Sequence, residues 1–74
     1  MSDIGWAIKQ LWNKDKVCRS GWNGKNMYLE LQVPDENSKM TEPYVYINFA
    51  NANRIPWTCS QSDLLATDWM ITNG

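Results

Sequence analysis

Two segments of the chain alternate regularly between apolar and polar side chains, and this pattern restricts the fold more than any other feature of the sequence. Over residues 27–33 and 44–49 every second side chain is apolar. Side chains of a β-strand point alternately to the two faces of a sheet, so each segment predicts a strand with one apolar face on a core. The polar set expected to face solvent is Tyr28, Glu30, Gln32, Tyr44, Tyr46 and Asn48.

Shorter elements complete an α+β fold around these strands. Apolar side chains at helical spacing after Asp3 predict a helix over residues 3–13, and they are Ile4, Ala7, Ile8 and Leu11. The Ser60-x-x-Asp63 pattern is a capping box that predicts a second, short helix. Further strands are expected over residues 16–19, 54–57 and 68–71. The predicted fold class is a small antiparallel sheet with two short helices, in a single domain of residues 1–74.

The small size of the chain favours assembly as an oligomer. A domain of 74 residues buries only roughly 60% of the surface that its unfolded chain exposes, so such domains commonly depend on a disulfide, a metal or a partner subunit. The chain has no histidine, and Cys18 and Cys59 stand forty-one residues apart, which is not a zinc-site spacing. We therefore expect no metal and no cofactor, and self-association becomes the expected source of additional stability.

The two cysteines are expected to be free and largely buried, with a Cys18–Cys59 disulfide as the alternative. The N-terminal residues show no charged segment followed by an apolar one, so no secretion signal is visible and a reducing compartment is expected. No apolar run approaches the roughly 18 residues of a membrane span.

Charge is distributed unevenly along the chain. Five basic and two acidic residues give residues 1–27 a charge of +3, whereas two basic and six acidic residues give residues 28–74 a charge of −4. The N-terminal third could face an anion, or the two halves could simply be solvated surfaces. A net charge of −1 argues against a protein that binds DNA or RNA.

The sequence predicts a binding protein and not an enzyme. Nucleophilic catalysis of the Ser–His or Cys–His type needs a histidine base, which the chain lacks. Asp63 and Asp68 are the carboxylates nearest to the aromatic segments, and they are expected to cap a helix and face solvent, not to form an acid–base pair. No glycine-rich phosphate loop of the Walker or dinucleotide-binding type occurs.

Five tryptophans in so short a chain exceed what a small core encloses easily. Trp6, Trp12 and Trp69 are expected in the core or in a subunit interface. Trp22 and Trp57 stand beside small polar residues, where an indole could stack on a nucleobase, although core or interface packing is the alternative for both. The start of the second helix at Ser60 offers backbone N–H groups to an anion, or is an ordinary cap.

Two stretches resemble the signatures of a known family. Residues 19–27 read RSGWNGKNM and residues 56–69 read PWTCSQSDLLATDW. They are similar to the paired signatures R-x-GWNGK-x-M and PW-x-x-SQ-x-DLLA-x-DW of the second type of Thoeris anti-defence proteins. With the first helix and the intervening strands, the resemblance covers nearly the whole chain.

This resemblance implies a phage sponge that acts in the cytoplasm of the infected bacterial host. Such proteins form homotetramers and sequester immune messengers without cleaving them. The expected ligands are glycocyclic ADP-ribose of the Thoeris system and cyclic di- or trinucleotides of the CBASS system. The compact loop between Val33 and Tyr44 departs from longer members, so contacts made by a longer insert are not carried over.

The candidate ligand-binding residues come from the two stretches, and we place the pocket between protomers. The turn after Arg19 is expected near the Trp57–Asp63 segment of the same or a neighbouring chain. The site set is Arg19, Trp22, Asn23, Lys25, Trp57, Thr58, Ser60, Gln61 and Asp63. Trp22 or Trp57 would stack the base, and Asn23 and Gln61 would read base or ribose edges. Lys25 or Arg19 would hold phosphate, with the Ser60 helix start. Asp63 would accept hydrogen bonds from ribose or base.

The alternative function is inhibition of a host immune effector protein through exposed tryptophans, which are frequent at interface hot spots.

Overall fold

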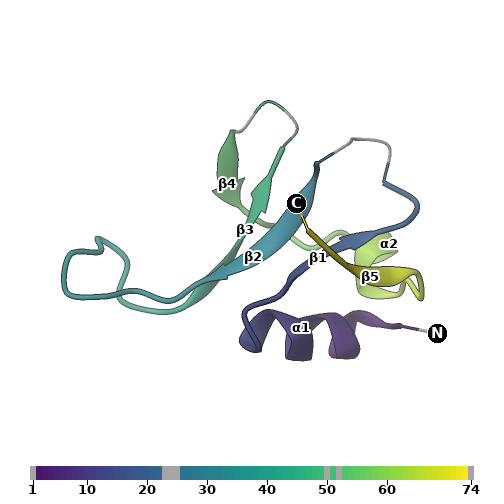
Figure 1. The fold of residues 1–74 in the computed structure, drawn as a ribbon, viewed down its shortest axis with the longest axis horizontal. Helices are drawn as coiled ribbons and strands as arrows, with labels where there is room; N and C mark the ends of the chain where they lie inside the picture. The colour runs from purple at the N-terminus through teal and green to yellow at the C-terminus, as the bar shows by residue number, and fades with distance from the viewer. Residues whose placement is uncertain (1, 23–25, 50, 52, 74) are drawn as a thin grey trace.

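The computed structural model describes residues 2–22, 26–49, 51 and 53–73, which form one five-stranded antiparallel sheet with two helices. The elements are α1 (Ile4–Trp12), β1 (Lys16–Arg19), β2 (Tyr28–Gln32), β3 (Tyr44–Asn48), β4 (Arg54–Pro56), α2 (Gln61–Leu64) and β5 (Trp69–Thr72). The strand order is β4-β3-β2-β1-β5, so the chain passes from one edge of the sheet through α2 to the opposite edge. The predicted α+β class and each predicted element are confirmed (Figure 1).

Local signals explain where the helices begin and end. The Asp3 carboxylate accepts a hydrogen bond from the Trp6 N–H at 2.9 Å and caps α1. Lys14 has a φ of 70°, and this left-handed residue turns the chain into β1. Ser60 caps α2 in the predicted way, because its hydroxyl accepts the Asp63 N–H at 3.1 Å.

The core lies between α1 and one face of the sheet. In Figure 1, α1 runs along one side of the strands, while the long loop between β2 and β3 extends away from the body of the molecule. The buried apolar set is Ala7, Leu11, Val17, Leu29, Ile47, Ala66 and Trp69. Two residues of the predicted apolar faces lie elsewhere. Ile8 is 46% exposed on α1, and Val33, beyond the end of β2, is 45% exposed.

The second face of the sheet is more enclosed than the alternation predicted. Tyr28, Tyr46 and Asn48 were expected to face solvent, but all three are buried, with exposures of 7–9%. Long basic side chains explain the difference. The Lys16 ammonium lies 4.8 Å from the centroid of the Tyr28 ring, and the Arg54 guanidinium lies 5.7 Å from that of Tyr46. Their aliphatic stems cover ring surface while their charges stay near water.

Both cysteines, Cys18 and Cys59, are free thiols, and each is half-buried. Burial is the main cause that raises the pKa of each thiol above its ordinary value. Neither thiol is therefore activated as a thiolate nucleophile. Neither α1 nor α2 is long or apolar enough to cross a lipid bilayer.

Candidate functional site

Pairing of β1 with β5 brings the two signature stretches together within one chain. Arg19, the last residue of β1, lies opposite Trp69, the first residue of β5. The backbone then continues the contact, because the Ser20 N–H donates to the Asp68 carbonyl at 3.1 Å. The segment after β1 therefore lies beside α2 and the start of β5 (Figure 1). The described parts of the two stretches thus meet within one chain, and the placement of a pocket between protomers stays a prediction.

Arg19 joins two carboxylates at the centre of this junction. Its Nε donates to Asp68 Oδ1 at 2.7 Å, and its Nη1 donates to Asp63 Oδ1 at 2.8 Å. All three side chains are partly shielded, with exposures of 21% for Arg19, 14% for Asp63 and 31% for Asp68. One guanidinium therefore holds the β1 end against both α2 and β5.

Arg19 also fixes the ionisation of its partners. Partial burial acts to raise the pKa of Asp63, but hydrogen bonds from Arg19 and Trp22 outweigh it and leave that pKa below its ordinary value. Hydrogen bonding from Arg19 is the main cause that lowers the pKa of Asp68, and the Gly21 N–H adds to it. Both carboxylates are ionised at neutral pH and are consequently poor general acids.

The second oxygen of Asp68 binds the turn that precedes Trp22. Asp68 Oδ2 accepts the Gly21 N–H at 2.9 Å and the Ser20 hydroxyl at 3.2 Å. A Cβ atom at position 21 would lie only 3.1 Å from this oxygen, so glycine permits the close approach. The sequence had suggested Asp68 as a surface group. Asp68 stands next to Trp69 in the same signature, and this position is the feature of the sequence that could have identified its role.

Three indoles form a cluster beside the ion pairs. Trp69 is 2% exposed, which confirms its predicted place in the core. Trp22 and Trp57 each contact it edge to face, at centroid distances of 5.4 Å and 6.0 Å. Both are half-buried and pack against the core, so each combines core packing with a partly exposed ring.

Asp63 ties two of these indoles to α2. Trp22 Nε1 donates to Asp63 Oδ1 at 3.3 Å, and Trp69 Nε1 donates to the Asp63 backbone oxygen at 3.2 Å. The indole of Trp22 is therefore fixed both by ring packing and by its N–H group.

The remaining candidate residues divide into two groups. Thr58, Ser60 and Gln61 are exposed around the start of α2, where α2 has only four residues and so a weak dipole. Asn23 and Lys25 lie outside the residues that the structure describes. The assignment of all nine candidates to a ligand stays a prediction.

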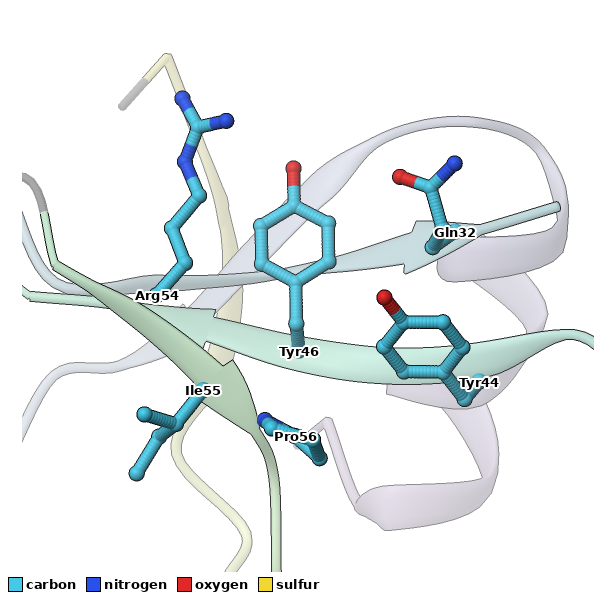
Figure 2. A pocket seen from close by; sticks show the side chains of 6 residues that line it. All are labelled: Gln32, Tyr44, Tyr46, Arg54, Ile55 and Pro56. Atoms are coloured by element: carbon cyan, nitrogen blue, oxygen red, sulfur yellow. The ribbon is translucent and has the colours of Figure 1, made fainter. Parts of the chain in front are cut away.

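A separate hollow lies on the face of the sheet that points away from the core. Its volume is about 230 Å³, and it is lined by Gln32, Tyr44, Tyr46, Arg54, Ile55 and Pro56. Figure 2 shows the side chains of Arg54, Tyr46, Gln32 and Tyr44 projecting to the same side of the strands. Arg54 Nε donates to Asn48 Oδ1 at 3.1 Å, and the Tyr46 hydroxyl donates to Glu30. Of these residues only Pro56, the first residue of the second signature, belongs to either signature. The sequence had classed the tyrosines only as solvent-facing.

A second, more open hollow of about 530 Å³ lies at the tip of β3 and β4. It is lined by Met27, Phe49, Asn51, Asn53 and Ile55. No group of three or more Cys, Asp or Glu side chains in the described part of the chain is arranged to hold a metal ion.

Comparison with known proteins gives two findings. The family model of the Thoeris anti-defense 2-like domain matches residues 2–72. The protein Thoeris anti-defense 2 of Bacillus phage SP01 is 35% identical over 83 aligned positions, which cover 95% of this chain and 93% of that protein. Both matches include the two signature stretches and the elements between them.

Proposed function

The chain belongs to the Thoeris anti-defense 2-like family, and on that basis we propose that it acts against the Thoeris defence as a phage-type sponge. In this proposal it binds cyclic nucleotide messengers, glycocyclic ADP-ribose first, and leaves their bonds intact. It works in the cytoplasm of the infected bacterium as a homotetramer. Cyclic di- and trinucleotides of the CBASS system are further ligands.

The observation that carries the proposal is the convergence of the two signatures on one aromatic and charged cluster. Trp22 and Trp57 flank the buried Trp69 and keep part of their rings exposed. An exposed indole held by packing loses little freedom when a base stacks on it, which favours affinity. The polar side chains of Thr58, Ser60 and Gln61 lie in the same stretch as Trp57 and supply donors and acceptors for ribose or phosphate.

The chemistry of the cluster supports binding without cleavage. General acid catalysis requires a group that is protonated near neutral pH. Arg19 keeps the pKa values of Asp63 and Asp68 below their ordinary range, so both carboxylates stay ionised there. In the proposal, Asn23 and Lys25 contact the ligand directly, while Arg19 and Asp63 act through the ion pair that they form.

Calorimetry with glycocyclic ADP-ribose tests the site. We expect Trp22→Ala to weaken binding by about 10-fold or more, because stacking on an aromatic ring contributes about 1–3 kcal/mol per base. We expect a loss of similar size for Asn23→Ala, because a ligand group left without its hydrogen-bond partner costs about 1–3 kcal/mol. Met40→Ala is the control, since it removes an apolar side chain that is 51% exposed in the loop between β2 and β3. If both folded site variants bind as tightly as the parent, the site is elsewhere.

Recovery of the ligand tests the absence of cleavage. The protein is incubated with glycocyclic ADP-ribose, denatured by heat, and the released nucleotide is analysed by chromatography. We expect intact nucleotide in an amount that matches the protein, whereas degraded nucleotide would revive an enzymatic function. A panel of CBASS cyclic nucleotides in the same assay defines the range of ligands.

The alternative function is inhibition of a host immune effector protein, and the exposure of α1 favours it. Trp12 and Ile8 lie one helical turn apart and are 58% and 46% exposed. Large exposed aromatic side chains are typical of interface hot spots. The two functions differ in one measurement, because a protein that blocks Thoeris and retains no nucleotide would act on a protein partner.

A further inference from the structure

The backbone that leads into Trp22 is held from outside by one carboxylate. Asp68 Oδ2 accepts hydrogen bonds from the Gly21 N–H at 2.9 Å and the Ser20 hydroxyl at 3.2 Å. Its other oxygen, Oδ1, accepts from Arg19 Nε at 2.7 Å. Asp68 therefore binds three consecutive residues of the segment 19–21, immediately before the indole.

The same contacts extend to the indole itself. Arg19 Nη1 donates to Asp63 Oδ1, and that oxygen also accepts the Trp22 Nε1–H at 3.3 Å. A continuous set of hydrogen bonds thus runs from the backbone at Gly21 through Asp68, Arg19 and Asp63 to the ring of Trp22. The carboxylates of Asp63 and Asp68 therefore restrain Arg19, before the turn at residues 20–21, and Trp22, after it.

We propose that Asp68 is a positioning residue of the nucleotide site, which sets the orientation of Trp22 before any ligand arrives. The inference rests on the proposed function, because it concerns the same site. Asp68 acts through Arg19 and the turn and does not touch the ligand. It has no place among the nine ligand contacts predicted from the sequence.

A positioning role has a kinetic signature that a ligand contact lacks. If only a fraction of the molecules holds Trp22 correctly, the apparent association rate falls by that fraction, and the bound state, once formed, dissociates at its usual rate. Loss of a direct contact has the opposite signature, because it mainly accelerates dissociation. The two rate constants therefore separate the two roles.

The primary test is Asp68→Asn, measured by stopped-flow binding of glycocyclic ADP-ribose. The amide keeps the size of the carboxylate, but it cannot accept hydrogen bonds at both ends of the group. We expect the association rate constant to fall about fivefold or more, with the dissociation rate constant within about twofold of the parent. Glu42→Gln is the matched control, since it removes the same charge from an exposed residue of the loop between β2 and β3.

Gly21→Ala provides a second variant that leaves every charge in place. The added Cβ would stand 3.1 Å from Asp68 Oδ2, so the carboxylate or the turn has to shift by a few tenths of an ångström. We expect a loss of association rate in the same direction as in Asp68→Asn, but a smaller one. Because both changes act on one contact, the double variant should lose no more than Asp68→Asn alone, which is the non-additivity of a shared interaction.

A measurement without ligand separates this inference from the proposed function. Hydrogen exchange at the indole Nε1 positions is followed by NMR in the parent and in Asp68→Asn. We expect faster exchange at Trp22 and unchanged exchange at Trp69, whose N–H donates to the Asp63 backbone. If the parent binds no cyclic nucleotide, the proposed function fails, while this exchange difference still decides whether Asp68 orders Trp22.

Two results would overturn the inference. An increased dissociation rate with an unchanged association rate would make Asp68 a ligand contact. Unchanged exchange at Trp22 in both folded variants would show that the turn does not depend on Asp68.

Discussion

A single guanidinium determines the charge state of two carboxylates in this molecule. Arg19 lies 2.8 Å from Asp63 and 2.7 Å from Asp68, and each contact lowers the pKa of the carboxyl group concerned. An isolated arginine is a good phosphate ligand, whereas a guanidinium between two carboxylates has its charge compensated. Electrostatics at this point therefore serves to join the signatures and not to attract an anion.

The lowered pKa of Asp63 leads to a prediction for stability against pH. A carboxyl group with a lowered pKa in the folded state contributes stability above its unfolded pKa of about 3.9, and the contribution is lost as pH falls through the folded pKa. We expect the urea midpoint of the parent to be steady between about pH 7 and 5 and to decline below about pH 4.

Asp63→Asn and a control complete this measurement. The variant should start from a lower urea midpoint at neutral pH and should decline less in acid, because its side chain no longer ionises. Glu42→Gln, in the exposed loop, should follow the parent. Parallel declines of the parent and Asp63→Asn would contradict a stabilising role for the ionised Asp63 carboxylate.

Tyr46 carries a second titration that can be measured. Burial and the neighbouring Glu30 raise its pKa to about 12. We expect the absorbance titration of the native protein to show one of its three tyrosines ionising about two pH units late, since an ordinary tyrosine has a pKa of about 10. The stability from this proton is complete below about pH 10 and is lost as pH rises through 12.

Tyr46→Phe should remove the late titration. It also deprives Glu30 of its hydrogen-bond donor, at an expected cost of about 1 kcal/mol in the free energy of unfolding. A native titration in which no tyrosine ionises near pH 12 would show that the Tyr46 ring is not enclosed.

At the scale of elements, the helix and strand bounds could be predicted to within about a residue because local signals mark them. Asp3 and Ser60 cap the helices, and strict alternation marks β2 and β3. The position of β5 beside β1 could not be predicted. It has no alternation between buried and exposed side chains after Trp69, since Met70 and Ile71 are both exposed. Long-range packing of Trp69 decides its place.

The candidate site, too, could be predicted from the sequence only in part. The paired signatures predicted that residues 19–27 and 56–69 would meet, and the structure brings their described parts together. The pairing of Arg19 with Asp63 and Asp68 was not predicted, because partner choice among charged residues depends on the register of β1 against β5. The enclosure of Tyr46 was missed for a related reason, since Arg54 reaches it from a neighbouring strand.

The capping residue of α2 provides a prediction at this scale. Ser60→Ala removes the acceptor for the Asp63 N–H, and loss of such a cap typically costs about 1 kcal/mol. Because Asp63 also holds Arg19 and Trp22, we expect weaker nucleotide binding as well as a lower urea midpoint. Ser62→Ala, an exposed position of the same helix, should change neither. Equal behaviour of the two variants would show that the cap does not support the site.

For the whole molecule, the expected self-association would cover large apolar side chains that one chain leaves exposed. Leu65 is 76% exposed, Trp12 58% and Ile55 52%. We expect light scattering to give a mass above that of the 8.6 kDa chain, and we expect the melting temperature to rise with protein concentration, since association stabilises the folded form. A mass of one chain at every concentration would contradict assembly as an oligomer.

The pairing of β1 with β5 also bears on how this protein is made. Arg19 pairs with Asp68, which is 49 residues later in the sequence. Most of the domain must therefore be synthesised before the two signatures can meet. Contacts between such distant residues form slowly compared with neighbouring hairpins. Until β5 has emerged, Arg19 lacks Asp68 and Trp22 lacks Trp69, so the proposed binding site is assembled in one late step.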